Sequence, residues 1–304
     1  MTSNNSITIL DGGMGQELVK RSSKEITPLW STQVMIDEPE IVRDLHEDYI
    51  KAGSRVITLN AYTMTPERLK RDGQVEDFET LQLAAVSAAT SARMNAGIPG
   101  VRIAGCLPPL VASYHSEVAP KYEDMLESYA KVVEIQAPHV DVFLCETMSS
   151  IDEAKAALVS AQKSGKPVWV SLTVNDADAG LENAQLRSGE LLTDAIAMLD
   201  EMGADEKLIN CSKPEAIAAA WPDMNAAQGL TGAYANGFTS IENLKPGGTV
   251  KSLESRADLG PDAYAEFALQ WAKDGATLIG GCCEVGPAHI KAIVKRFAKA
   301  GYTV

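Results

Sequence analysis

The chain has 304 residues, of which 45% are hydrophobic and 22% are charged, as in a folded enzyme with a sizeable core. Its 41 acidic and 27 basic residues give a formal net charge of -14, which disfavours nucleic acid as a partner because that surface repels phosphate. No run of 18 apolar residues occurs and residues 1–6 are polar, so we expect neither a membrane span nor a signal peptide, and a cytoplasmic protein.

Short apolar runs alternate with helical patterns along the chain. Strands are predicted at 7–10, 55–59, 101–104, 142–145, 168–173, 207–209, 229–231 and 277–279. Helices are predicted at 41–52, 80–95, 122–136, 151–163, 191–202, 215–220, 262–273 and 287–300. Eight alternating pairs predict a single-domain (β/α)8 TIM barrel over residues 1–304, with a doubly wound open sheet as the alternative. The stretch 236–260, which holds Pro246 and Gly247, is predicted to be a long loop on the active side.

Polar and thiol groups follow each predicted strand. In chain order they are Asp11 and Gly12, Asn60 and Tyr62, Cys106, Glu146 and Thr147, Thr173 and Asn175, Asn210 and Cys211, Tyr234 and Asn236, and Cys282 and Cys283. The carboxyl ends of the strands meet at one face of such a barrel, where the chemistry of these folds takes place. We therefore expect these groups to surround one mouth.

The cysteines give the sharpest chemical signal. Their odd number, five, in a long chain argues against a disulfide framework and favours metal binding or catalysis. Cys211, Cys282 and Cys283 stand at strand ends, and Zn²⁺ prefers such thiolate ligands. The adjacent pair can reach one ion if the chain turns, for which Gly280 and Gly281 offer backbone freedom. Three protein ligands would leave a fourth position open, as in catalytic zinc sites. The alternative is three small buried apolar side chains.

Two cysteines and one histidine are assigned differently. Cys145 lies within a predicted strand, and we expect it in the core. Cys106 stands at a strand end, but we do not make it a ligand because a fourth thiolate would close the site. His115 is an ambiguous signal that could lie at the mouth or elsewhere.

At these residues the sequence resembles the homocysteine S-methyltransferase family, along nearly the whole chain. The matching segments are Asp11-Gly12-Gly13-Met14-Gly15, Trp30, residues 46–53, Asp141 to Glu146-Thr147, residues 167–171, Asn210-Cys211 and Gly280-Gly281-Cys282-Cys283. The resemblance implies a (β/α)8 barrel with zinc held by Cys211, Cys282 and Cys283. It also implies that Asp11, Gly12 and Glu146 hold the amino end of homocysteine, and we add Asn60 to the substrate-binding residues. Glu284 departs from the pattern, since relatives often have glycine there.

The expected function is zinc-dependent transfer of a methyl group to homocysteine, giving methionine. Zinc would ionise the substrate thiol, so no further catalytic residue is expected. The donor would be S-methylmethionine, S-adenosylmethionine, betaine or a similar compound, and the sequence indicates neither which one nor the oligomeric state. The alternatives are another thiol acceptor, a corrinoid protein as partner, a metal hydrolase on the same barrel, or a non-catalytic zinc- or thiol-binding barrel.

Trp30, Tyr62 and Glu146, which we expect near the mouth, can each be interpreted in two ways. Trp30 and Tyr62 either contact a cationic donor through cation–π interactions or pack at the rim. Glu146 either binds an amino group or caps the helix that begins near Ile151.

Overall fold

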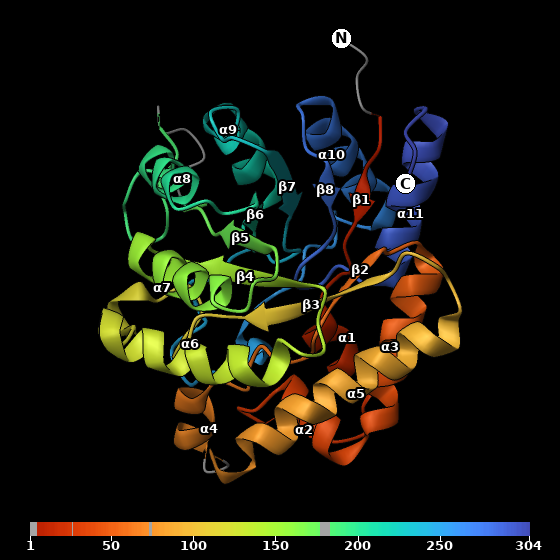
Figure 1. Ribbon diagram of the computed structural model, residues 1–304. Coiled ribbons are helices and arrows are strands. Elements are labelled where there is room, and N and C mark those ends of the chain that lie inside the picture. Colours follow the sequence, from red (N-terminus) through yellow and green to blue (C-terminus); the bar gives the residue numbers. More distant parts are fainter. Residues whose placement is uncertain (1–4, 26, 73–74, 177–182) are drawn as a thin grey trace.

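The computed structural model describes residues 5–25, 27–72, 75–176 and 183–304, in which eight parallel strands alternate with helices (Figure 1). The strands are β1 (Thr8–Ile9), β2 (Val56–Thr58), β3 (Arg102–Leu107), β4 (Val142–Met148), β5 (Val168–Leu172), β6 (Glu206–Asn210), β7 (Leu230–Tyr234) and β8 (Leu278–Ile279). Each overlaps one predicted strand. Their order in the sheet is β1-β8-β7-β6-β5-β4-β3-β2, so the sheet follows the chain around a circle. The predicted TIM barrel is confirmed, and the doubly wound alternative is wrong.

Contacts between β1 and β2 close the circle. The Arg55 amide donates to the Ile9 carbonyl at 2.7 Å, and the Ser54 hydroxyl donates to the Leu10 carbonyl at 3.0 Å. The Asp11 carboxylate accepts the Thr58 amide at 2.7 Å, one step nearer the mouth. A predicted substrate residue thus also joins the first two strands at their carboxyl ends.

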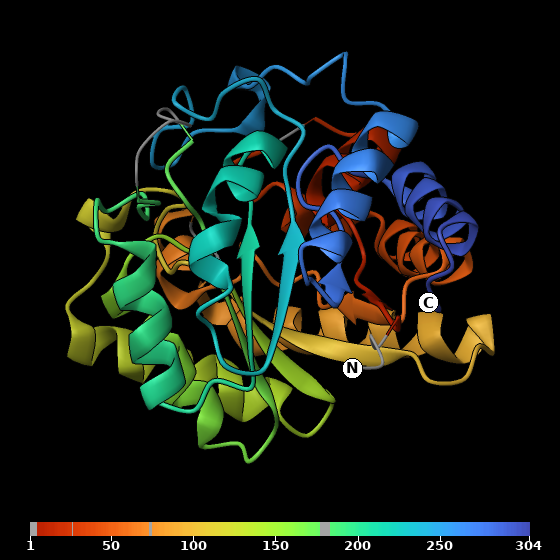
Figure 2. The same ribbon diagram turned by 90° about the horizontal axis from the view of Figure 1, so that it is seen from above.

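The helices form an outer ring around the strands in both ribbon views (Figures 1 and 2). The ring consists of α3 (Pro39–Ala52), α5 (Phe78–Ala96), α6 (Tyr122–Gln136), α7 (Ile151–Gln162), α8 (Leu192–Glu201), α9 (Pro214–Met224), α10 (Pro261–Lys273) and α11 (Pro287–Lys299). These confirm the predicted helices. Within the described residues no helix is long and apolar enough to cross a bilayer.

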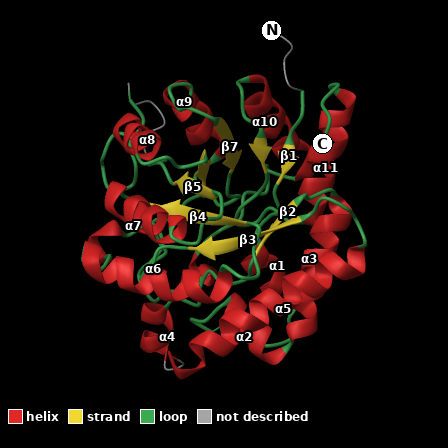
Figure 3. Cartoon of the chain, viewed as in Figure 1, coloured by secondary structure: helices red, strands yellow, loops and turns green. Residues whose placement is uncertain are grey.

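Short helices that the sequence did not predict lie in the loops after the strands. They are α1 (Met14–Arg21), α2 (Ser31–Asp37) and α4 (Pro66–Asp72), with single 3-10 turns η1 (Val75–Asp77), η2 (Ser116–Val118) and η3 (Val250–Ser252). Figure 3 shows α2 and α4 at the lower edge of the view, outside the strands. Two turns of helix are too few for the apolar repeat to stand out from the sequence, which is why these elements were missed.

Successive side chains of a strand point alternately into the barrel and toward the helices, which divides the core into two layers and sets the direction of the site residues. On β4, Val142 and Leu144 pack inside the barrel, whereas Phe143 and Cys145 pack between the strands and the helices. Cys145 is therefore a core residue, as predicted. Because successive side chains point to opposite faces, Glu146 continues the inward series of Val142 and Leu144. The strand therefore aims this carboxylate into the barrel mouth.

Candidate metal and substrate site

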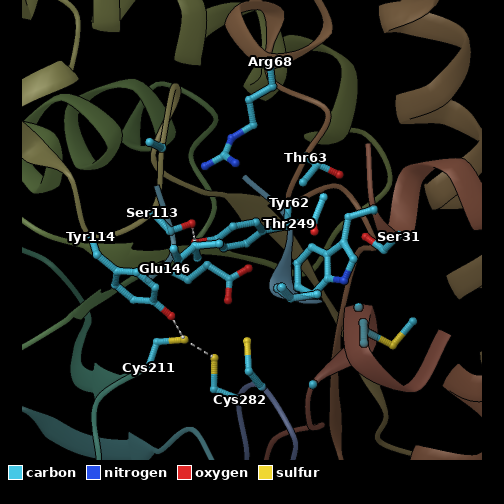
Figure 4. A pocket seen from close by; sticks show the side chains of 18 of the residues that line it. Ser31, Tyr62, Thr63, Arg68, Ser113, Tyr114, Glu146, Cys211, Thr249 and Cys282 are labelled. Atoms are coloured by element: carbon cyan, nitrogen blue, oxygen red, sulfur yellow. Dashed lines mark hydrogen bonds between the residues drawn. The ribbon is translucent and has the colours of Figure 1, made fainter. Parts of the chain in front are cut away.

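The three cysteines at the ends of β6 and β8 come together at the mouth of the barrel. The sulfur atoms of Cys211, Cys282 and Cys283 all lie within 4.8 Å of one another, and the Cys211 and Cys282 sulfurs are 2.7 Å apart (Figure 4). A tetrahedral zinc with Zn–S bonds of about 2.3 Å would separate its sulfur ligands by roughly 3.8 Å. The three sulfurs are close enough together to be ligands of one ion, so the donor set fits a thiophilic metal.

Cys211 is held in an uncommon backbone conformation. Its φ is +50°, a left-handed value that costs energy for a residue with a side chain. Three donors converge on its carbonyl: the Asn236 amide nitrogen at 2.9 Å, the Thr173 hydroxyl at 3.4 Å and the Arg187 guanidinium at 3.4 Å. This network turns the chain at the end of β6, so that the thiol faces the end of β8.

The neighbouring Asn210 explains the Asn-Cys pair seen in the sequence. Its side-chain amide accepts the Thr147 amide at 3.0 Å and donates to the Thr147 hydroxyl at 2.9 Å. Thr147 also has a left-handed φ, +63°. Asn210 therefore links β6 to the irregular end of β4 at Thr147, and its side chain does not line the cavity.

The glycines before the cysteine pair are needed for close packing. A Cβ on Gly280 would lie 2.6 Å from the Leu10 Cβ, and one on Gly281 would lie 2.0 Å from a Val285 methyl group. Neither glycine has a left-handed φ; in this loop Glu284 has one, +66°. The predicted reason for the glycines, backbone freedom, is therefore wrong, because the crowded junction of β1 and β8 requires them.

Tyr264 on α10 fixes the ends of β7 and β8 relative to each other. Its buried hydroxyl accepts the Ala235 amide at 2.9 Å and donates to the Gly280 carbonyl at 2.8 Å. Gly280 stands two residues before Cys282, so this helix residue supports the cysteine loop from behind.

Two carboxylates stand beside the cysteines. Burial raises the pKa of Glu146 to about 8, with Asp11 and Cys211 adding negative charge nearby, and burial raises the pKa of Asp11 to about 7. Glu146 faces the cavity and accepts the Cys106 thiol at 3.0 Å, while Asp11 is 6% exposed and bonds to Thr58. Both carboxylates would gain from a bound cation, which would restore their charged forms.

The other predicted substrate residues, Gly12 and Asn60, also line this cavity. A Cβ on Gly12 would lie 2.1 Å from the Val285 carbonyl oxygen, so no larger residue fits. The Asn60 side chain donates to the Ser31 carbonyl at 3.2 Å and thereby ties β2 to α2. All seven predicted site residues thus surround one cavity.

The cavity encloses about 140 Å³ and has an aromatic wall. Trp30 and Tyr62 line it and meet edge to face, with ring centroids 6.4 Å apart. The loop 236–260 lines it too, through Phe238 and Leu244 among others, so the predicted active-side loop is confirmed. No histidine of the described chain lines the cavity, which disfavours the metal hydrolase because that class normally uses histidine ligands.

Two residues of the site went unnoticed in the sequence. The Tyr114 hydroxyl lies 2.9 Å from the Cys211 sulfur (Figure 4), and the Arg187 guanidinium stacks over the Tyr114 ring at 4.8 Å while pairing with Asp176 at 3.1 Å. Hydrogen bonds from Cys282, Cys283 and Tyr114, with Arg187 nearby, hold the pKa of Cys211 well below its ordinary value. Both residues lie in loops without periodicity, so only the chain path could reveal them.

Three open questions from the sequence are resolved by contacts. His115 does not line the cavity: its ring contacts the Leu244 carbonyl at 2.8 Å and braces the 236–260 loop. Cys106 lies inside β3 and outside the cysteine cluster. Ser150 caps α7 by accepting the Glu153 amide at 3.3 Å, so the capping role considered for Glu146 is wrong.

Comparisons with known proteins agree with this geometry. The family model described as "Homocysteine S-methyltransferase" matches residues 8–297. The homocysteine S-methyltransferase of Escherichia coli is 28% identical over 310 residues, covering 95% of each chain. Homocysteine S-methyltransferase 4 of Zea mays is 26% identical, covering 97% of this chain and 90% of its own. The selenocysteine Se-methyltransferase of Brassica oleracea is 26% identical, covering 95% and 88%.

A solved structure has the same fold. The metallated form of the homocysteine methyltransferase MmuM from Escherichia coli superposes with a TM-score of 0.78 and 26% identity, covering 96% of both chains.

Proposed function

The chain belongs to the homocysteine S-methyltransferase family, and from that premise we propose that it moves a methyl group from an activated donor to the thiol of homocysteine, giving methionine. The barrel over residues 1–304 would be the homocysteine-binding unit, with Cys211, Cys282 and Cys283 as zinc ligands. The observation that carries the proposal is the convergence of three thiols, the buried Asp11 carboxylate and the half-buried Glu146 carboxylate on one cavity.

The thiol cluster supports zinc in particular. Three sulfur donors suit a borderline-soft ion, and three protein ligands leave one position for the substrate sulfur. When bound, zinc would stabilise the ionised substrate thiol, which is the nucleophile. The Tyr114 hydroxyl lies 2.9 Å from the Cys211 sulfur, and it would donate to that sulfur in the thiolate form that binds zinc.

The chain's own residues would place the acceptor. Glu146 and Asp11 offer carboxylates to the ammonium group of homocysteine, at the same end of the cavity as the cysteines. Gly12 lies beside them at a position where a side chain would collide with the Val285 carbonyl oxygen and the Tyr49 ring. Orientation of this kind holds the substrate sulfur next to the methyl group to be transferred.

The partners are therefore a small amino-acid thiol and a small methyl donor. S-methylmethionine, S-adenosylmethionine, betaine and related compounds all carry an activated methyl group. The thiols must stay reduced to bind a metal, which favours a reducing compartment such as the cytoplasm.

Methyl transfer with purified, zinc-loaded protein tests the proposal. Homocysteine, cysteine and selenocysteine, each labelled in its carbon chain, are offered with each donor, and the methylated product of each acceptor is followed. Labelled methionine supports the proposal. Transfer only to another acceptor would change the substrate, and binding of zinc and homocysteine without transfer from any donor would favour the non-catalytic alternative.

A further inference from the structure

The cavity has a second, basic end. Arg68 and Arg71 on α4, with Lys245 from the long loop, line it together with the site described above. Figure 4 shows the Arg68 side chain entering from the side opposite Cys211 and Cys282, with Tyr62 and Glu146 between them. The cavity is therefore acidic beside the cysteines and basic at the far end.

Arg68 is a buried cation that lacks an acidic partner. It is 7% exposed, and its Nε and Nη2 donate to one carbonyl, that of Pro109, at 3.3 and 3.0 Å. In the described part of the chain no carboxylate oxygen lies within 4.0 Å of its nitrogens. Buried charges are normally paired, because desolvation of an unpaired charge is costly. Burial also lowers the pKa of the Arg68 guanidinium from its ordinary value.

Two carboxylates that interact electrostatically with Arg68 are engaged elsewhere. Asp72 forms two contacts of 3.0 Å with Arg71. Glu153 accepts the Ser149 amide at 3.0 Å, and burial raises its pKa to about 7, so it carries a full charge only above neutral pH. The guanidinium also lies over the Tyr62 ring, 5.5 Å from its centroid, a contact that leaves the Nη1 donors available for an anion in the cavity.

We propose that Arg68 binds the carboxylate of the methyl donor, so that the donor is a zwitterion with a sulfonium or quaternary ammonium group and a carboxylate. This rests on the proposed function. The onium group would lie toward the cysteines along the wall formed by Trp30 and Tyr62, and the carboxylate would extend to the basic end.

The transfer step balances with such a donor. The homocysteine thiol first loses its proton to solvent. The sulfur–methyl bond to homocysteine forms as the donor's onium–methyl bond breaks, and that electron pair stays on the donor atom. The donor leaves without its positive charge, while its carboxylate is unchanged and Arg68 holds donor and product through the same contact.

The acceptor's carboxylate is less suited to Arg68. In homocysteine the carboxylate and the ammonium share one carbon atom. If Glu146 and Asp11 hold the ammonium, the carboxylate stays at the cysteine end, whereas Arg68 reaches the cavity from the other side of Tyr62.

Matched donor pairs test the assignment. S-methylmethionine, dimethylsulfoniopropionate and glycine betaine are each compared with the corresponding primary amide, in zinc-loaded wild-type protein and Arg68→Gln. Wild type should prefer the carboxylate by roughly 10- to 100-fold in kcat/KM, as expected for a charged hydrogen bond. Arg68→Gln should lose this preference, while its amide rates and its KM for homocysteine change by less than about 3-fold.

Controls separate recognition from folding. Lys70→Gln on the same helix removes an exposed cation that does not line the cavity, and it should keep the carboxylate preference. Arg68→Lys should restore part of the preference, because the cation returns without the planar pair of donors. Zinc content and melting temperature of each variant show whether the barrel is intact.

Binding by calorimetry without homocysteine distinguishes the two proposals. Wild type should bind each carboxylate donor at least 10-fold more tightly than its amide, and Arg68→Gln should not. If wild type shows this binding preference and Arg68→Gln does not, but no donor supports methyl transfer, the proposed function is refuted while the assignment of Arg68 as a carboxylate-binding residue stands. Equal preference in wild type and Arg68→Gln, or a large rise in KM for homocysteine with amide donors, would overturn the assignment.

Discussion

At the scale of single residues, the site depends on side chains that neighbouring strands hold in fixed positions. Cys211 adopts a left-handed φ because three donors hold its carbonyl, and Thr147 does so because Asn210 bonds to it twice. Uncommon backbone conformations of this kind persist where surrounding contacts fix them, often at functional sites. Contacts within the protein thus position Cys211 in the cysteine cluster.

The ligand set leads to a prediction about metal content. Cys211→Ala, Cys282→Ala and Cys283→Ala should each lose most of the bound zinc, because two thiolates hold zinc far less tightly than three. Cys145→Ala is the matched control, since its thiol is buried in the core away from the cluster. Metal analysis of purified variants measures this, and full zinc retention in one of the three would remove that residue from the set.

The carboxylates lead to a prediction about pH. Burial raises the pKa of Glu146 to about 8, so below that pH its carboxyl group is largely protonated in the substrate-free protein. The carboxyl group must then release its proton to bind an ammonium group. Homocysteine affinity should therefore rise between pH 6 and 8. Glu146→Gln should bind roughly tenfold or more weakly at pH 8.

Calorimetry in buffers of different ionisation enthalpy counts the protons. Glu146→Gln should release up to about one proton fewer than wild type on binding homocysteine at pH 7, because the thiol proton is common to both. An unchanged affinity and proton count would show that Glu146 does not contact the acceptor.

At the scale of elements, the short helices and the long loop shape the cavity, while the segments that follow β6 and β8 carry the proposed metal ligands. α4 contributes Arg68 and Arg71, and the 236–260 loop contributes Phe238 and Leu244. β6 and β8 end at the cysteines, and α10 supports both β7 and β8 through Tyr264. Under the two proposals, the metal would bind at the strand ends and the donor would be recognised by α4 and the loops, all at the face where this barrel carries its functional residues.

Tyr264→Phe tests the support from α10. Loss of the hydroxyl leaves the Ala235 amide and the Gly280 carbonyl short of a buried partner, which should cost about 1–3 kcal/mol in the free energy of unfolding. Zinc affinity should fall as well, because Cys282 follows Gly280 by two residues.

Tyr302→Phe is the control, since that ring packs on Phe297 next to the bridge between Ser6 and Thr303, at the opposite end of the barrel. Denaturant unfolding and competition with a chromophoric chelator measure the two effects. Equal losses in both variants would argue against a specific role for the Tyr264 hydroxyl.

At the scale of the whole molecule, the barrel brings residues 71 positions apart, Cys211 and Cys282, to a sulfur separation of 2.7 Å. A metal ion bound there would link the ends of β6 and β8 in the native state only. Ligands that bind the folded state stabilise it by mass action.

Chelation should therefore lower the melting temperature, by roughly 5–10 °C for a tightly bound ion in a domain of this size. Differential scanning calorimetry of zinc-loaded and chelated protein measures the shift. Cys211→Ala should show almost no shift, and a wild-type melting temperature that ignores chelation would contradict a metal bridge between the strands.

The sequence by itself was sufficient to predict the barrel and to group the residues that line the cavity around the cysteines. Alternating apolar runs and helical patterns specify a (β/α)8 fold, and that fold brings all strand ends to one face. Asp11, Asn60, Glu146 and the three cysteines could therefore be grouped by their positions after strands alone. Their roles as zinc ligands and substrate-binding residues stay predictions until the variants are measured.

Only the tertiary structure decided what surrounds these residues. Tyr114, Arg187 and Arg68 stand in loops or a two-turn helix, where no periodic signal marks a side chain as facing the site. Local sequence encodes the direction of a side chain on a strand through its two-residue period, but loops have no such period. The contacts of Tyr114 and Arg187 with Cys211, and the basic end of the cavity, therefore follow from the path of the folded chain.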